Sequence, residues 1–269
     1  MTFLYETHLH TCQSSACGKS TGAEHVRAYK AAGYTGIFVT DHFFGGNTAI
    51  PRDLPWEERI RRFARGYEDA KAEGDRVGLD VFFAWEETFQ GDDYLIYGLD
   101  PAWLIQHPEA DHWSRREQLE KVHAGGGCVV QAHPFRLRDY IPKALLGLRY
   151  CDGIEIANAG NEALWDVCAA NYAAWAGLPV TAGSDNHLSK PGQMEDGRLY
   201  GVRLEKRLTC AADYARVILS GQSPELFVPE GRLKATPDMV CPDSYWLDEK
   251  ERAVRTDVDW VKMDGDISL

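Results

Sequence analysis

The chain has 269 residues and carries 29 Lys and Arg against 41 Asp and Glu, a formal net charge of -12. Its composition, with 44% hydrophobic and 26% charged residues, is that of a globular protein and excludes disordered, collagen-like and coiled-coil chains. The excess of acidic residues disfavours a nucleic-acid polymer as partner, so we expect a small substrate.

The hydropathy pattern of the sequence predicts neither a membrane helix nor a secretory signal. No apolar run approaches the roughly 18 to 20 residues that a membrane helix needs, and residues 1–13 contain no basic segment followed by an apolar stretch. We therefore expect a cytoplasmic protein with no membrane partner, while its oligomeric state stays open. The seven cysteines are widely spaced and form no CxxC pair, which predicts reduced thiols. Cys12 and Cys17 flank the first motif loop and could be soft metal ligands or redox-sensitive thiols, but small buried packing residues are the favoured interpretation.

In the first part of the chain, a short strand is predicted over residues 3–10 and a helix over 22–32. Thr21 and Glu24 have the spacing of a capping box and mark the start of that helix. A strand over 34–40 follows, and a second helix begins at Pro55. Its apolar residues recur at helical spacing, at Trp56, Ile60, Phe63, Tyr67 and Ala70.

The rest of the chain continues the alternation of strands and helices. Strands are predicted over 81–84, 94–99, 128–132, 153–157, 179–182 and 199–204, and helices over 117–124, 162–176 and 211–219. This alternation predicts a parallel sheet, and seven or eight such units favour a closed, deformed TIM-like barrel over an open sheet. We expect residues 1–228 to form the barrel and 229–269 to form a C-terminal extension packed on it.

Histidines and acids gather where the predicted strands end. The positions are His8, His10, Asp41, His42, Glu86, His133, Asp185 and His187. In a barrel these carboxyl ends converge on one face. Residues two apart on an extended chain point the same way, so His8 and His10 can hold one ion together. Imidazole and carboxylate ligands together favour Zn, Mn or Fe over Ca or Mg, and a site with more than one metal ion is expected.

Four ordered motifs and a strand-end glutamate resemble the polymerase and histidinol phosphatase (PHP) family over about residues 3–190. The motifs are HLHT at 8–11, TDH at 40–42, AHP at 132–134 and SDNH at 184–187, and the glutamate is Glu86. The resemblance implies an α/β fold, a distorted TIM-like (β/α)7 barrel of PHP type, with two or three divalent metal ions that hydrolyse phosphate esters.

Carried over position by position, the resemblance also implies a ligand set. One metal would be held by His8, His10, Glu86 and Asp185; Glu86 would bridge to a second metal held with His133; His42 and His187 would hold a further one. The chain departs from the family in two places. Residues 13–16 offer no strong ligand where members with three metals usually have a His or Asp, and Asp93 stands where a His is frequent. Glu87 is an alternative to Glu86, and Asp92 to Asp93.

The expected reaction is attack on phosphorus by a metal-bridging hydroxide, since metal binding lowers the pKa of water. Arg136, three residues after His133, would either clamp a phosphate with two parallel hydrogen bonds or pair with surface acids. Asp41 or His187 would pass a proton to the leaving group. The expected substrate is a small phosphomonoester or nucleotide, and loops 43–54, 137–141 and 188–198 would set specificity.

Two other interpretations stay open. An amidohydrolase-like metal hydrolase shares the HxH start, but that class normally bridges its metals with a modified lysine, and this chain has a glutamate there. A barrel that binds metal without catalysis, in a structural or regulatory role, would explain the missing ligand near Ser15. The remaining histidines are expected to be structural or solvated, namely His25, His107, His112 and His123.

Overall fold

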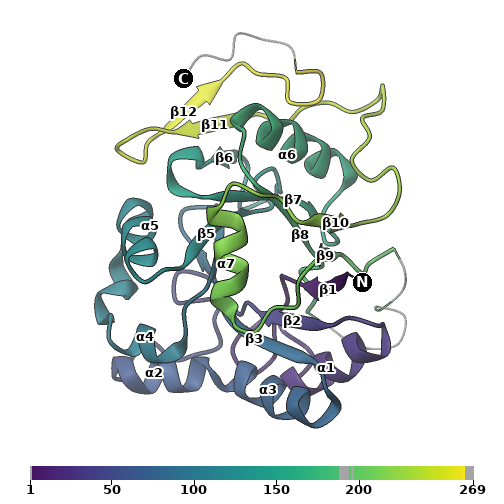
Figure 1. Ribbon diagram of the computed structural model, residues 1–269. Coiled ribbons are helices and arrows are strands. Elements are labelled where there is room, and N and C mark those ends of the chain that lie inside the picture. Colours follow the sequence, from purple (N-terminus) through teal and green to yellow (C-terminus); the bar gives the residue numbers. More distant parts are fainter. Residues whose placement is uncertain (1, 188–193, 195–196, 264–269) are drawn as a thin grey trace.

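The computed structural model describes residues 2–187, 194 and 197–263 (Figure 1). Nine strands form one sheet in the order β10-β9-β1-β2-β3-β4-β5-β7-β8, which curves into a nearly closed barrel. Their bounds are β1 Phe3–Glu6, β2 Gly36–Val39, β3 Asp80–Thr88, β4 Asp93–Tyr97, β5 Cys128–Ala132, β7 Gly153–Asn158, β8 Val180–Gly183, β9 Gly201–Leu204 and β10 Glu225–Phe227. The distorted α/β barrel that the sequence predicts is confirmed.

The expected parallel sheet is wrong in part. β4 pairs antiparallel with both β3 and β5, and β9 pairs antiparallel with β1 and β10. Only residues 89–92 separate β3 from β4, which is too short for the crossover of a dozen or more residues that parallel strands require. Because β4 runs backwards, its first residue, Asp93, lies at the same edge of the sheet as the carboxyl end of β3.

Helices surround the barrel, at α1 Gly22–Ala31, α2 Trp56–Phe63, α3 Arg65–Val77, α4 Pro101–Ile105, α5 Arg115–Ala124, α6 Ala163–Ala176 and α7 Ala211–Leu219. The capping box at the start of α1 is present, since Thr21 accepts from the Glu24 backbone and Glu24 accepts from the Thr21 backbone. The single helix predicted after Pro55 is instead two helices that meet at Ala64. The two helices pack against different neighbours: α2 packs on α4, whereas α3 packs on α1 and β3.

Aromatic side chains fill the barrel, and α7 closes one end. Tyr214 of α7 contacts Phe38 and Tyr97, with ring centroids 5.1 and 5.0 Å apart. Ala215 of α7 lies against Gly98, just after β4 ends. In Figure 1, α7 crosses the centre of the ring of strands. The other end of the barrel, where β4 begins, is therefore the open one.

The C-terminal residues add a three-stranded sheet, β12 Ala253–Thr256, β11 Ser244–Leu247 and β6 Ala144–Leu146. Trp260 is fully buried beneath it, and its ring centroid lies 5.4 Å from that of Tyr172 in α6. The Trp260 indole N–H donates to the Ser244 hydroxyl at 3.0 Å. This segment thus packs on the barrel over the described residues 229–263, while 264–269 lie outside the described part. The domain boundary at residue 228 stays a prediction.

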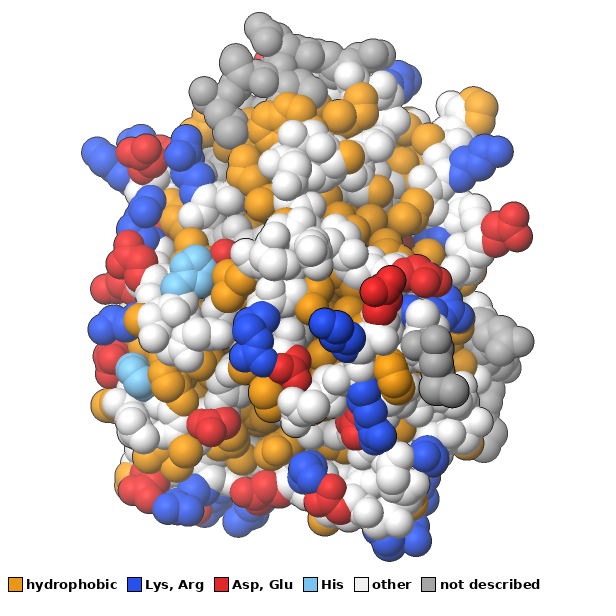
Figure 2. Space-filling model, viewed as in Figure 1, with side chains coloured by type: hydrophobic (Ala, Val, Ile, Leu, Met, Phe, Trp, Pro, Cys, Tyr) orange, Lys and Arg blue, Asp and Glu red, His pale blue; other side chains and the backbone are white. Residues whose placement is uncertain are grey.

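Two features of the whole molecule bear on partners. On the face shown in Figure 2, Lys and Arg side chains are interspersed with Asp and Glu, so the acidic excess is not gathered there. Among the described helices, none has the length and apolar character needed to cross a membrane.

Candidate metal centre

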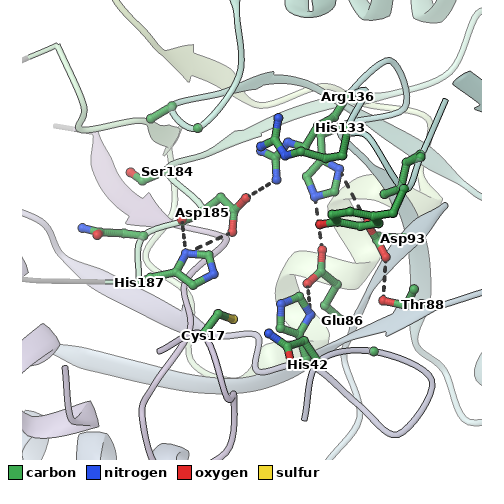
Figure 3. A pocket seen from close by; sticks show the side chains of 18 of the residues that line it. Cys17, His42, Glu86, Thr88, Asp93, His133, Arg136, Ser184, Asp185 and His187 are labelled. Atoms are coloured by element: carbon green, nitrogen blue, oxygen red, sulfur yellow. Dashed lines mark hydrogen bonds and ion pairs between the residues drawn. The ribbon is translucent and has the colours of Figure 1, made fainter. Parts of the chain in front are cut away.

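The eight predicted ligands come together at the open end of the barrel, beside a cleft of about 600 Å³ (Figure 3). The ring centroids of His8 and His133 are 5.6 Å apart, and those of His10 and His187 are 4.5 Å apart. His10 also stacks on His42 at 4.2 Å. Side chains from four distant stretches of sequence therefore share one site.

Within the described residues, three groups have ligand atoms that all lie within 4.8 Å of one another. They are His8, His10 and Asp185; His8, Glu86 and His133; and His10, His42 and His187. Nitrogen and oxygen donors at this spacing suit transition-metal ions with tetrahedral or higher coordination. The donor set fits divalent metal ions.

Glu86 occupies the middle of the cluster. Its Oε1 lies 3.4 Å from His8 Nε2 and 3.2 Å from His133 Nε2, and its Oε2 lies 2.6 Å from His42 Nδ1. Burial would raise the Glu86 pKa, but His42 and His8 hold it well below the usual range. Glu86 Oε2 and His42 Nδ1 are buried, yet neither makes a hydrogen bond of acceptable geometry. A cation shared by these two atoms would satisfy both of them.

The position of Glu86 corrects one detail of the sequence prediction. Glu86 lies inside β3, which runs to Thr88, and is not at the strand's end. β3 extends beyond its neighbour, so that the backbone at His42 continues the ladder by a bridge to Glu86. This extension is what brings a residue from within a strand into the open end of the barrel.

Asp185 completes the first group. Its Oδ1 lies 3.0 Å from His10 Nε2 and 3.5 Å from His8 Nε2. Asp185 and His133 have backbone φ angles of 50° and 29°, in the left-handed region that residues other than glycine rarely adopt. Such strain is typical of functional sites, where the surrounding structure holds it in place.

The structure distinguishes the two pairs of neighbouring acids. Glu86 faces the histidines, whereas Glu87 accepts hydrogen bonds from the backbone N–H groups of Gly45 and Thr88. Burial raises the pKa of Glu87 to about 8. The Glu87 carboxyl group is therefore bonded to the loop after β2 and does not face the histidines.

Asp93 is the member of the second pair that lies near the cluster. Its Oδ2 lies 3.9 Å from His133 Nδ1, and its Oδ1 accepts from the Thr88 hydroxyl at 2.6 Å. Asp92 instead forms a buried ion pair with Arg115. Asp93 thus lines the cleft, while Asp92 anchors α5.

Of the two residues predicted to transfer a proton, only His187 lines the cleft. Asp41 is buried and accepts three hydrogen bonds, from the Thr11 backbone, the Thr11 hydroxyl and the Ser15 hydroxyl, at 2.6 to 2.7 Å. Burial raises its pKa to about 6 despite these bonds. Asp41 thus holds the loop that follows His10 in place, and its role in proton transfer stays a prediction.

Arg136 also lines the cleft, and its side chain is only 12% exposed, so it is not a surface arginine. Nε, Nη1 and Nη2 donate to Asn161, Asp185 and Asn158 at 2.5 to 2.7 Å. Three of its five N–H groups are therefore used within the protein. The phosphate clamp stays a prediction, with two N–H groups left for it.

Glu155, which no sequence motif singled out, lies behind the histidines in β7. Its Oε1 pairs with His8 Nδ1 at 2.9 Å, and its Oε2 accepts from the His133 backbone N–H at 3.2 Å. Such a partner fixes the tautomer and orientation of a ligating imidazole. The available signal was a glutamate in the middle of the apolar run GIEIA, which burial would penalise unless it were paired.

For Cys17, a small buried packing residue was the favoured interpretation, and a soft metal ligand or a redox-sensitive thiol was left open. The side chain is half-buried and lines the cleft, which does not fit the favoured interpretation. Burial would raise its pKa, but hydrogen bonds with His187 and His42 lower the pKa of the thiol to about 6. Spacing alone gave no signal, because Cys17 lies seven residues after His10 in a loop of irregular structure.

Comparisons with known proteins place the fold. No family model and no curated protein matches the sequence. A two-domain protein from Bacteroides vulgatus, containing a predicted PHP-like metal-dependent phosphoesterase, matches with a TM-score of 0.61 and 14% identity, over 85% of this chain and 65% of that one. The chain has a PHP-type fold.

Two further solved structures share this PHP-type fold. A proposed metal-dependent phosphoesterase from Bifidobacterium adolescentis matches over 81% of this chain and 96% of its own, with 18% identity and a TM-score of 0.50. An amidohydrolase from Chromobacterium violaceum with bound sulfate and no metal matches over 84% and 98%, with 16% identity and a TM-score of 0.50. At these identities the likeness establishes the fold alone, and this chain spans less than two thirds of the Bacteroides protein.

Proposed function

We propose that this protein is a metal-dependent hydrolase of phosphate esters that acts on a small phosphomonoester or nucleotide. The observation that carries the proposal is the convergence of five histidines and two carboxylates, from distant parts of the sequence, in the three groups that could hold metal ions. Grouping so many titratable side chains in one buried site without cations would be costly. The PHP-type fold shared with the solved structures supports the same reaction class.

The side chains around the cleft favour an anionic substrate. Arg136, Arg138 and Arg198 line it, and the last two form no ion pair with a described residue. In a chain with a net charge of -12, arginines without an acidic partner at the mouth of a cleft are the exception. Guanidinium groups bind phosphate oxygens through paired hydrogen bonds.

Two or three divalent ions, Zn, Mn or Fe, would be held by the three histidine and carboxylate groups described above. When bound, such ions lower the pKa of water and neutralise charge on phosphate oxygens. The protein's own part is to hold the ester beneath Arg138 and Arg198 and to exclude bulk water from the buried side of the cleft. His187 is partly exposed on the cleft wall and would hold a metal ion through Nε2, because its Nδ1 is bonded to the Asp185 carbonyl. Its transfer of a proton to the leaving oxygen stays a prediction from the sequence.

The amidohydrolase alternative has no supporting feature in the site. Glu86 occupies the central bridging position, and none of the described residues that line the cleft is a lysine. The amidohydrolase from Chromobacterium violaceum has a related fold, which does not distinguish the two reactions. Phosphate ester hydrolysis is therefore the proposal we favour.

The test is hydrolysis of a generic aryl phosphate by purified protein loaded with manganese or zinc. We expect turnover that depends on the metal and is abolished by the double substitution His8→Ala and His10→Ala. His123→Ala is the matched control, because His123 pairs with Asp152 at the surface, away from the cleft. Unchanged turnover in the double variant would refute the proposed site. Metal ions bound without turnover on any phosphate ester would favour a non-catalytic barrel.

A further inference from the structure

Cys17 lies on a loop that the structure fixes closely against the site. The first-motif loop, defined here as residues 11–20, follows His10 and turns back beside the cleft. The Ala16 N–H donates to the Asn47 carbonyl at 2.9 Å, and the Lys19 N–H donates to the His187 carbonyl at 2.8 Å. These bonds tie the loop to the segments that carry His42 and His187.

The thiol of Cys17 points at the imidazoles of those two segments. Cys17 lines the cleft together with His42 and His187, and Figure 3 shows its sulfur beside these two rings. Cys12, on the same loop, is exposed and lies 3.8 Å from Gln13 Oε1. The two cysteines of one loop therefore have different surroundings, and only Cys17 faces the histidines.

The ligand count gives Cys17 a role. His10 belongs to two of the three groups, with His8 and Asp185 and with His42 and His187. Its Nε2 lies 3.0 Å from Asp185 Oδ1 and 3.2 Å from His8 Nε2, so that this atom serves the first group. A nitrogen atom binds one metal ion only. The ion beside His42 and His187 would then have these two imidazoles and the Glu86 Oε2 that lies next to His42, one ligand fewer than the four that zinc usually takes.

We propose that Cys17 supplies that ligand, as a thiolate bound to a metal ion together with His42 and His187. The family resemblance left this site without the His or Asp that members with three metals usually have, and Cys17 follows directly after the four residues that lack one. Two imidazoles and a thiolate form a soft donor set that selects zinc or cobalt over manganese and magnesium. This metal ion would therefore differ in identity from ions held by imidazole and carboxylate alone.

When the metal ion binds, it replaces the proton of the Cys17 thiol. The thiol proton leaves to solvent as the sulfur–metal bond forms, and nothing is oxidised or reduced. The inference rests on the metal centre of the proposed function, but it does not depend on which ester, if any, is hydrolysed.

The test is the absorption spectrum of full-length protein stripped of metal and loaded with Co²⁺, together with its cobalt content. A thiolate bound to cobalt gives a charge-transfer band in the near ultraviolet that imidazole and carboxylate ligands do not give. We expect the band in the natural protein and in Cys12→Ser, and its loss in Cys17→Ser. Cys17→His should bind as much cobalt as the natural protein while lacking the band, because a nitrogen ligand replaces the sulfur.

Three results would overturn the proposal. Bound cobalt without the band in the natural protein would exclude a thiolate ligand while leaving the metal centre intact. A band that survives in Cys17→Ser would assign the thiolate to another cysteine. Protein that binds no cobalt would refute both this inference and the metal centre of the proposed function. As a second readout, zinc should protect Cys17 from alkylation, located by peptide mass spectrometry, and His42→Ala should remove the protection.

Discussion

At the scale of single residues, the histidines of the site depend on buried acceptors behind them. His8 Nδ1 pairs with Glu155, and His187 Nδ1 donates to the Asp185 carbonyl at 2.8 Å. The His10 carbonyl is in turn bonded to the buried ring of His25, at 3.0 Å. Each bond limits the rotation of an imidazole or of its backbone, so that the site is held in its geometry before any ion binds.

The substitution Glu155→Gln tests this support. In the natural protein, the charge of Glu155 favours a proton on His8 Nδ1, so that Nε2 is the atom left to bind metal. The amide of glutamine keeps the size of the side chain but removes this charge. We expect metal affinity to fall by about 10- to 100-fold, measured by competition for zinc with a chromophoric chelator. Glu225→Gln is the control, since Glu225 is exposed on β10, and its affinity should equal that of the natural protein. Equal affinity in both variants would contradict the role of Glu155.

At this scale, the sequence could predict only part of the site, because burial and contacts between distant residues cannot be deduced from residue spacing. The spacing of His8 and His10, and of Asp185 and His187, was sufficient to predict candidate ligands, because each pair belongs to one strand end. Glu155 could not be assigned, since its partner His8 lies 147 residues away in the chain. For Cys17, a role as a soft metal ligand was left open but could not be favoured, because an irregular loop gives no periodicity from which to infer the direction of a side chain.

At the scale of elements, α3 packs directly against the first-motif loop. A Cβ atom at Gly66 would overlap the Thr11 hydroxyl and lie 2.8 Å from Asp41 Oδ2. Thr11 and Asp41 are bonded to each other and set the course of the loop that carries Cys17. The absence of a side chain at Gly66 therefore lets a helix approach the site.

Gly66→Ala should consequently be destabilising, although alanine in an exposed helix usually stabilises by about 1 kcal/mol. We expect a loss of about 1 to 3 kcal/mol in the free energy of unfolding, measured in urea, together with weaker zinc binding. Gly74→Ala is the comparison, because its Cβ would instead meet Val81 and the Leu79 carbonyl, away from the site. It should lower stability and leave zinc affinity unchanged. Weaker zinc binding in Gly74→Ala alone would contradict this account.

Element directions show where sequence reasoning reached its limit. The helix from Ala211 to Leu219 was predicted with the bounds that the structure has, since its apolar positions follow one face. The direction of β4 was not predicted, because alternating strands and helices were taken to imply parallel pairing throughout. The short connection at 89–92 contained the information, and Asp93 reaches the site only because β4 is antiparallel.

At the scale of the whole molecule, the C-terminal segment closes the outer side of the barrel. Trp260 lies among Phe135, Tyr172, Trp175 and Trp246, with ring centroids 5.4 to 6.2 Å apart. These side chains belong to α6, to the segment after β5 and to β11. This aromatic cluster connects the C-terminal segment to the main core. The sequence pattern predicted no helix or strand in that segment.

Trp260→Ala should therefore lower the free energy of unfolding by about 3 to 5 kcal/mol, as is usual for a large buried side chain. Urea unfolding measures this loss. Val254→Ala is the control, because Val254 is 49% exposed in the same segment, and we expect it to change stability little. The metal content of folded Trp260→Ala should equal that of the natural protein, since the cluster lies outside the site. A loss below about 1 kcal/mol would show that the segment is not part of the core.

The buried charges of the site also couple metal binding to the stability of the whole fold. Ligands that bind only the folded state stabilise it, by about 4 kcal/mol at a concentration 1,000 times the dissociation constant. We expect a chelator to lower the thermal unfolding midpoint and added zinc to restore it. In the double variant His8→Ala and His10→Ala, zinc should have a much smaller effect, and an equal shift in both proteins would contradict the proposed ligands.

In the proposed metal centre, histidines and carboxylates from distant parts of the chain together hold several metal ions. The most direct measurement is a crystal structure of the metal-loaded protein with anomalous scattering recorded at the absorption edge of the metal. We expect two or three anomalous peaks in the cleft, each within about 2.0 to 2.3 Å of its ligand atoms, with Glu86 between two of them. A metal-loaded crystal with no peak among His8, Glu86 and His187 would contradict the account.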